Sequence, residues 1–174
     1  MLSEVEVVKL EVPGGGAVEL RVVDRTSPQP GSPQPGSTQA SSPQASNAQA
    51  GGTRSVDQVL VVEGIVETGD GRGWTFRDAC LTVAEAATLG GWLLRAAKGR
   101  LELPDRLTFA ARTLTFTLEE HDHLQPRVTV GFSLAAAPPW LGEERDRTYD
   151  YPVTLDLDPE SLEAAAVDWE RQLT

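Results

Sequence analysis

The chain has 174 residues, a formal net charge of −11 at pH 7 and a sequence pI of about 4.6. Such a negative potential repels nucleic acid and anionic lipid surfaces and favours cationic partners, so we expect neither nucleic acid nor membrane as a partner. The single cysteine excludes an intramolecular disulfide. The first residues lack a signal-peptide pattern, and no apolar run is long enough to cross a membrane. We therefore expect a cytoplasmic protein that consists of one domain, 1–174.

The start of the chain predicts a β-hairpin. Residues 5–12 (VEVVKLEV) and residues 17–23 (AVELRVV) resemble strands and flank the turn PGGG. In the second arm, apolar residues alternate with charged ones, which predicts one buried and one exposed face. The alternating residues are Val18, Leu20 and Val22 against Glu19 and Arg21.

Two further strands are expected before the first helix. Residues 58–68 (QVLVVEGIVET) are rich in β-branched side chains, and residues 74–81 (WTFRDACL) follow the turn GDGRG. Neither PGGG nor GDGRG leads directly into a helix, and neither is followed by a Lys-Ser or Lys-Thr pair. A phosphate-binding loop needs those features, so we interpret both glycine-rich segments as turns.

Residues 26–55 differ in composition from the rest of the chain. Their main part, TSPQPGSPQPGSTQASSPQASNAQAGG, has no acidic, aromatic, Leu, Ile or Val residue. Such a segment cannot bury enough apolar area to offset the entropy of ordering it, which predicts a disordered Pro/Gln/Ser/Gly-rich insertion within the domain. The strands on its two sides should then be neighbours. An alternative is an adaptor protein in which these prolines tether partners.

Two helices are predicted, one before and one after the last group of strands. Thr82 and Glu85 form a capping-box pattern, and the helix that follows should end near Lys98–Arg100. Three more strands are predicted, at residues 112–122, 127–137 and 153–158. Asp158 with Pro159 then begins a second helix, whose apolar stripe comprises Leu162, Ala165, Ala166, Trp169 and Leu173.

This order predicts an α+β fold: a largely antiparallel β-sheet of about six or seven strands, with two helices packed on one face, in βββα-βββα order. The two strand-to-helix joints, TFRDACLTVAEAATLGGW and TLDLDPESLEAAAVDW, are alike. Their likeness indicates either a duplicated unit or the general requirements of such a joint.

Cys80 is the first candidate for chemistry, because it lies next to an acid, Asp78, near the expected helix start. A nucleophilic cysteine needs a base, usually a histidine. The only histidines, His121 and His123, occur in a polar stretch that resembles a turn. We therefore interpret Cys80 as a small apolar residue of the scaffold.

His121 and His123 are the candidates for a metal site. Residues two apart on a strand share a face, so two imidazoles could bind one metal ion with Glu119 or Asp122 as a third ligand. The alternative is a charged hairpin tip with ordinary exposed histidines. A small metal-binding or enzyme domain that uses His121 and His123 is thus an alternative function.

Acidic residues are concentrated near the end of the chain. Between residues 143 and 170 there are ten acidic residues against two arginines. This is either a solvated surface or a docking surface for a basic protein, with Trp140 as its apolar anchor. The candidate partner-binding residues are Trp140, Glu143, Glu144, Asp146 and Asp150.

Several segments, in order, resemble the WapI-type immunity proteins of bacterial polymorphic toxin systems. They include WTFRDACLT running into a helix that contains WLL, and VTLDLDPESL leading to the last helix. Together the matching stretches cover most of the chain outside the insertion. They are Val18–Val22, Val59–Val66, Trp74–Leu94, Leu114–Leu118, Val128–Trp140 and Val153–Leu173.

The resemblance implies inhibition by binding. Proteins of this family protect the producing cell from the C-terminal toxin domain of a large secreted protein, and the namesake counteracts a toxin that acts on tRNA. A nuclease toxin should present a basic surface, which a strongly acidic protein could occlude. The resemblance thus implies a protein that binds a toxin domain, is not an enzyme, and has no catalytic residues and no cofactor. The basic character of that domain is inferred separately, from the net charge of the chain, and a monomer is favoured.

Overall fold

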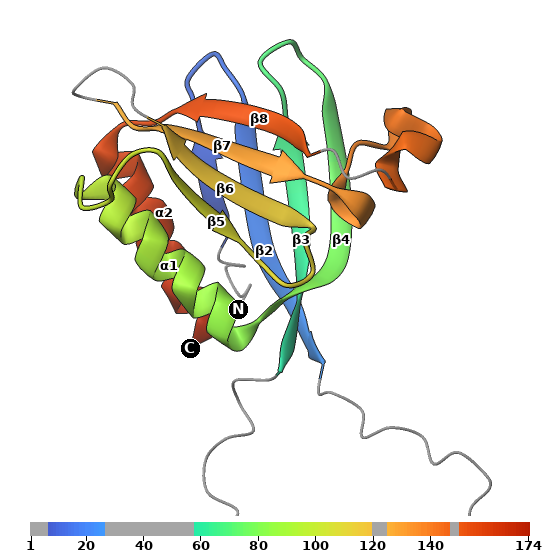
Figure 1. Cartoon of the computed structure of the whole chain (residues 1–174), viewed down its shortest axis with the longest axis horizontal. Coiled ribbons are helices and arrows are strands. Elements are labelled where there is room, and N and C mark those ends of the chain that lie inside the picture. The colour runs from blue at the N-terminus through green and yellow to red at the C-terminus, as the bar shows by residue number, and fades with distance from the viewer. Residues whose placement is uncertain (1–6, 27–57, 120–124, 147–149) are drawn as a thin grey trace, which may run out of the picture.

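The computed structural model describes residues 7–26, 58–119, 125–146 and 150–174. The predicted insertion, apart from its first residue, Thr26, therefore lies outside the described residues. Four antiparallel strands in chain order form the first sheet (Figure 1). They are β1 (Val8–Glu11), β2 (Ala17–Thr26), β3 (Val59–Glu67) and β4 (Gly73–Thr82). The predicted pairing of the strands on either side of the insertion is confirmed, because β2 and β3 are antiparallel neighbours from Ala17–Glu67 to Thr26–Val59.

A second antiparallel sheet, also in chain order, holds the other strands among the described residues. They are β5 (Asp105–Thr108), β6 (Leu114–Glu119), β7 (Arg127–Phe132) and β8 (Tyr151–Asp156). The prediction of one sheet with six or seven strands in βββα-βββα order was therefore wrong. The described residues form eight strands, and a helix follows each group of four. The strand that the pattern missed, β5, has only four residues and no buried side chain.

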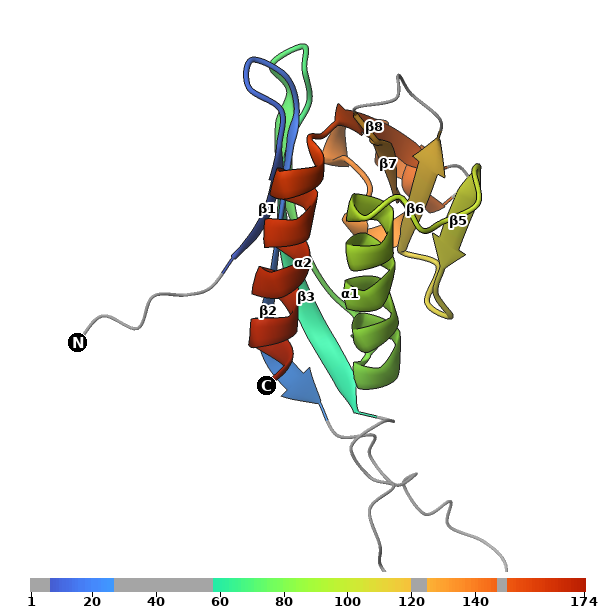
Figure 2. The ribbon, with the colours of Figure 1, turned by 90° about the vertical axis from the view of Figure 1, so that its left-hand side faces the viewer.

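The two α-helices, α1 (Val83–Ala97) and α2 (Pro159–Leu173), pack against each other. They were expected on one face of a single sheet, and this was also wrong. Figure 2 shows the pair between the two sheets, with α2 against the first sheet and α1 towards the second. Accordingly, α2 contacts β1 and β2, and the Trp92 ring of α1 lies 6.1 Å from the Phe116 ring of β6. Two facing sheets give each helix its own apolar surface to cover.

Both predicted helix caps are present. Thr82 Oγ1 accepts the Glu85 N–H at 3.1 Å, and the Glu85 carboxylate accepts the Thr82 N–H at 2.9 Å. The other Glu85 oxygen accepts the N–H of Ala110, so the cap of α1 also holds the turn between β5 and β6. Asp158 accepts the Ser161 N–H at 2.8 Å and begins α2. Each capped end fixes the direction in which a helix leaves its strand.

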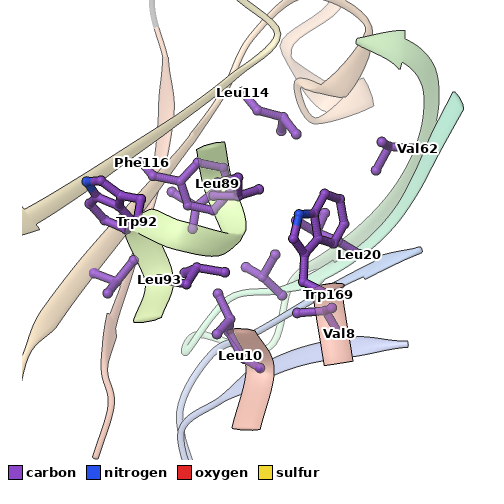
Figure 3. Packing of buried hydrophobic residues seen from close by; sticks show 14 of the residues in the cluster. Val8, Leu10, Leu20, Val62, Leu89, Trp92, Leu93, Leu114, Phe116 and Trp169 are labelled. Carbon is purple, nitrogen blue, oxygen red and sulfur yellow. The ribbon is translucent and has the colours of Figure 1, made fainter. Parts of the chain in front are cut away.

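The buried residues of both sheets and both helices form one cluster, in which Trp92, Trp169 and Phe116 are among the largest fully buried side chains (Figure 3). Three of the four tryptophans are buried, and each donates its indole N–H to a different element. The pairs are Trp74 with the Ala136 carbonyl at 2.8 Å, Trp92 with Asp105 at 2.7 Å, and Trp169 with the Ala86 carbonyl at 2.7 Å. These bonds satisfy the buried donors and fix the register of neighbouring elements. No helix among the described residues has the length and apolarity that crossing a membrane requires.

Candidate partner-binding surface

The candidate acidic residues occur in the connection between β7 and β8. This connection contains two short 3₁₀ segments, η1 (Leu134–Ala136) and η2 (Pro139–Asp146). No residue of η2 is buried, and its helical path is broken at Gly142, which has a φ of 56°. In Figure 1, η1 lies against β4 and η2 lies beyond η1, at the far side of the molecule from α1 and α2. We call Trp140, Glu143, Glu144 and Asp146 the η2 surface.

The backbone of this connection is anchored to the body of the protein before the η2 surface begins. The Trp74 indole on β4 donates to the Ala136 carbonyl, and Ala136 is fully buried. The Ser133 N–H bonds to the Thr113 carbonyl at 2.9 Å. Arg145 then donates back to the Ala135 carbonyl at 3.1 Å. The η2 surface is therefore presented from a fixed base, which reduces the entropy lost when a partner binds.

Trp140 is held in place although it is exposed. It keeps 42% of its accessible surface, yet its ring makes edge contacts with Trp74 at 5.3 Å and Tyr151 at 5.9 Å between centroids. The Arg72 guanidinium lies 5.8 Å from the ring centroid of Trp140, in a cation–π arrangement. A large exposed aromatic whose orientation is already fixed has the properties of an interface anchor.

Three exposed carboxylates follow Trp140 in η2, those of Glu143, Glu144 and Asp146. Arg145 is only partly exposed and is turned towards Ala135, so the solvent-facing side of η2 is acidic. These three carboxylates outnumber the exposed Arg72 cation beside Trp140, so the surroundings of this apolar anchor are mainly acidic and complement a basic protein surface.

Asp150, the fifth candidate, is placed differently. Its carboxylate accepts hydrogen bonds from the Thr115 and Ser133 hydroxyls and pairs with Arg106 at 2.9 Å. It lies over Gly131, where an added Cβ would be 2.9 Å from the Asp150 Cβ. The carboxylate thus connects β5, β6 and the end of β7 to the start of β8, and three donors within the protein already bond to it.

Cys80 is buried and lies where β4 carries one extra residue relative to β3. Burial, with a smaller contribution from the nearby charge of Asp78, raises the pKa of the Cys80 thiol to about 12. A thiol in that state is protonated at neutral pH and is a poor nucleophile. The placement agrees with its interpretation as a scaffold residue.

The candidate metal ligands His121 and His123, with Asp122, lie outside the described residues. Among the residues that are described, no three His, Cys, Asp or Glu side chains are close enough to hold a metal ion. The metal hypothesis for His121 and His123 therefore stays a prediction.

Sequence reasoning missed two contributors to the site, Arg72 and Tyr151. Arg72 lies in the turn GDGRG, which was interpreted only as a turn, and it comes 68 residues before Trp140 along the chain. Tyr151 begins β8, two residues before the start of the strand that was predicted at residues 153–158. The packing of the two sheets against each other brings these side chains to Trp140, so no local signal could have identified them.

The exposed, anchored Trp140 and the carboxylates of η2 are features that surfaces for binding another protein commonly have. The class of protein follows from comparison with known families. The model of the immunity protein WapI-like family matches residues 9–174, so the chain belongs to that family. Searches of curated proteins and of solved structures found no match.

Proposed function

We propose that this protein neutralises a cognate polymorphic toxin domain by binding it through the η2 surface, and that it does so without catalysis. Its membership in a family of immunity proteins supports a toxin-neutralising role. The partner, in this proposal, is a basic nuclease domain in the cytoplasm, and occlusion of its nucleic-acid-binding face is the mechanism. A protein of net charge −11 can compete for such a face as a polyanion.

The observation that carries this proposal is the state of Trp140. Its ring is fixed by Trp74, Tyr151 and Arg72 but remains 42% exposed beside exposed carboxylates. Packing inside one protein gains nothing from leaving so large an aromatic surface in water, whereas a partner that covers it gains substantially. In this arrangement Asp150 holds the loop and the other acids face the partner.

The experiment compares two truncations of exposed apolar side chains. Trp140→Ala removes the proposed anchor, and Leu103→Ala is its control, because Leu103 is 44% exposed in the loop between α1 and β5. The neighbouring gene is first examined for a secreted protein with a C-terminal toxin domain, and binding to that purified domain is then measured by calorimetry. We expect Trp140→Ala to weaken binding about tenfold or more and Leu103→Ala to leave it unchanged. Equal affinities for both variants, with both folded, would overturn the assignment of this surface.

Charge is tested separately through the association rate. The double variant Glu143→Gln/Glu144→Gln neutralises two exposed carboxylates of η2, and Glu102→Gln neutralises an exposed carboxylate in the loop between α1 and β5. If complementary charge steers the encounter, the double variant associates more slowly and loses part of the salt dependence, because steering acts mainly on the association rate. An unchanged salt dependence contradicts the steering role of η2.

A further inference from the structure

The first sheet has an open edge at β1. Within the described ranges β1 pairs with β2 alone, so its other side has no strand partner. An unpaired edge presents backbone N–H and C=O groups that can bond to an added strand.

The register shows which groups point outward. The Val12 N–H bonds to the Gly16 carbonyl, which makes this a hydrogen-bonded pair. Directly opposite residues in an antiparallel ladder alternate between hydrogen-bonded and non-hydrogen-bonded pairs. The pairs Lys9–Glu19 and Glu11–Ala17 are therefore non-hydrogen-bonded. The backbone groups of Lys9 and Glu11 accordingly face away from β2, towards the open side.

A groove of about 440 Å³ runs along this edge, between β1 and α2. Its α2 wall consists mostly of short side chains, those of Ser161, Ala164 and Ala165. Short side chains on this wall leave room beside β1 for the side chains of another strand. The groove is thus bounded by a strand edge on one side and a helix on the other.

The charges of the groove favour a cationic occupant. Glu11, Asp158 and Asp168 line it, against Lys9 as the one cation among its lining residues. Lys9 is paired with Glu11 at 2.7 Å and with Glu19 at 3.5 Å, so this cation is neutralised and the charge of Glu11 is partly neutralised as well. The hydrogen bonds that Asp158 accepts from Ser161 lower the pKa of its carboxyl, so it stays ionised at neutral pH. Asp168 is partly neutralised by Arg171 at 3.2 Å.

We propose that this groove binds an extended, lysine- or arginine-bearing segment of the toxin, which adds to β1 as a fifth strand of the first sheet. This rests on the proposed function and adds a second contact, remote from η2. The backbone of the added strand pairs with Lys9 and Glu11, as in other cases of strand addition. Its alternate side chains face the short residues of α2, and its cations meet the carboxylates of the groove. A second copy of this chain is a poorer occupant, because it brings the same acidic groove and a net charge of −11.

The test uses a defined probe, a capped seven-residue peptide of alternating lysine and valine, and measures its binding by NMR titration of the full chain. One control peptide has glutamate in place of lysine, and another carries N-methyl groups on the amides that would pair with β1. We expect saturable binding with shifts confined to β1 and the facing side of α2. We also expect about tenfold or greater weakening in both controls. Equal binding of the N-methylated peptide would show electrostatic attraction without strand pairing and would overturn the proposal.

Two variants of the protein and one control variant complete the test. Glu11→Pro removes an outward N–H while the β1–β2 hydrogen bonds remain, and Glu11→Ala is its control because it keeps that N–H. Ala164→Arg places a cation on the exposed α2 wall and covers the case in which Glu11→Pro does not fold. Glu11→Pro and Ala164→Arg should each abolish peptide binding. Dimerisation that is lost in Glu11→Pro, with no peptide binding, would instead assign the edge to a second copy.

The same variants separate this inference from the proposed function. If Trp140→Ala weakens toxin binding while Ala164→Arg and Glu11→Pro leave it unchanged, neutralisation through η2 stands and strand addition by the toxin is excluded. If the peptide binds as expected but the Trp140 variant binds toxin normally, the η2 assignment fails and the groove remains.

Discussion

A methyl group at position 90 of α1 would lie 3.3 Å from Cδ1 of Trp169 on α2, so Gly90 provides the space in which this indole sits. The same indole donates to the Ala86 carbonyl, one turn earlier on α1. Gly90 and Gly91, the two glycines in the middle of α1, therefore differ in their structural roles. At Gly91, an added Cβ would meet no atom within 4 Å.

This difference predicts opposite outcomes for two alanine substitutions. Gly91→Ala should raise the free energy of unfolding by about 0.5–1 kcal/mol, because alanine restricts the unfolded chain and favours the helix. Gly90→Ala gains the same propensity but presses on Trp169, so we expect no net stabilisation or a loss. Urea denaturation of both variants measures the difference. Equal stabilisation by both substitutions would contradict the close fit between α1 and α2.

Asp150 should matter for stability more than the exposed acids of η2 do. Asp150→Ala removes the acceptor of two hydroxyls and the partner of Arg106, which we expect to cost about 1–3 kcal/mol. Glu144→Ala removes an exposed carboxylate and should change stability by less than about 0.5 kcal/mol. Thermal denaturation compares the two. A fully stable Asp150→Ala protein would show that its hydrogen bonds do not hold the connection between β7 and β8.

Cys80 should be unreactive in the folded protein. With its pKa raised to about 12, the thiol should resist alkylation at pH 8 and react only after denaturation. The unfolded thiol ionises near pH 9, so its contribution to stability is fully present below that pH and is lost as the pH rises towards 12. Mass spectrometry of labelled protein, with and without urea, measures this reactivity.

Substitution of Cys80 tests its scaffold role. Cys80→Ala or Cys80→Ser should lower stability by roughly 1–3 kcal/mol and leave toxin neutralisation intact. Cys80→Ser also removes the ionisation, so its stability should vary less between pH 9 and 12 than that of the natural protein. A folded Cys80→Ser protein that no longer neutralises toxin would reopen the possibility of an enzyme.

Removal of residues 27–52 should leave the fold and toxin neutralisation intact. Thr26 and Val59 are paired across β2 and β3, with a hydrogen bond from Thr26 Oγ1 to the Val59 carbonyl, so the two ends of the segment are fixed side by side. Because the cost of closing a loop depends only weakly on its length, a shorter connection can replace it. Loss of neutralisation in a folded deletion variant would favour the adaptor hypothesis.

Local features of the fold could be predicted from the sequence, whereas the assembly of the two halves could not. The caps at Thr82 and Asp158 and the hairpin at PGGG follow from residues close in the chain, and the structure confirms them. The division into two sheets depends on contacts such as Trp74 with Phe132, whose residues are remote in sequence. Period-2 alternation shows that a strand has a buried face but not which surface buries it.

The features of the candidate site likewise fall into two groups: those that the sequence could predict and those that required the tertiary structure. Trp140 and the acids of η2 are neighbours in the chain, so their proximity could be predicted. The contribution of Arg72, the anchoring of the loop by Trp74 and the use of Asp150 within the protein required the tertiary structure. None of these long-range contacts leaves a pattern in a single sequence.

The burial of three tryptophans and the exposure of the fourth give the protein an internal optical reporter. Trp74, Trp92 and Trp169 are shielded from solvent and hydrogen-bonded, whereas Trp140 is open to it. Emission from Trp140 should therefore lie at longer wavelength and be the component that acrylamide quenches. A ligand that covers η2 would remove this quenchable component, and one that occupies the groove beside β1 would leave it in place. Intrinsic fluorescence can thus indicate which of the two surfaces a partner covers.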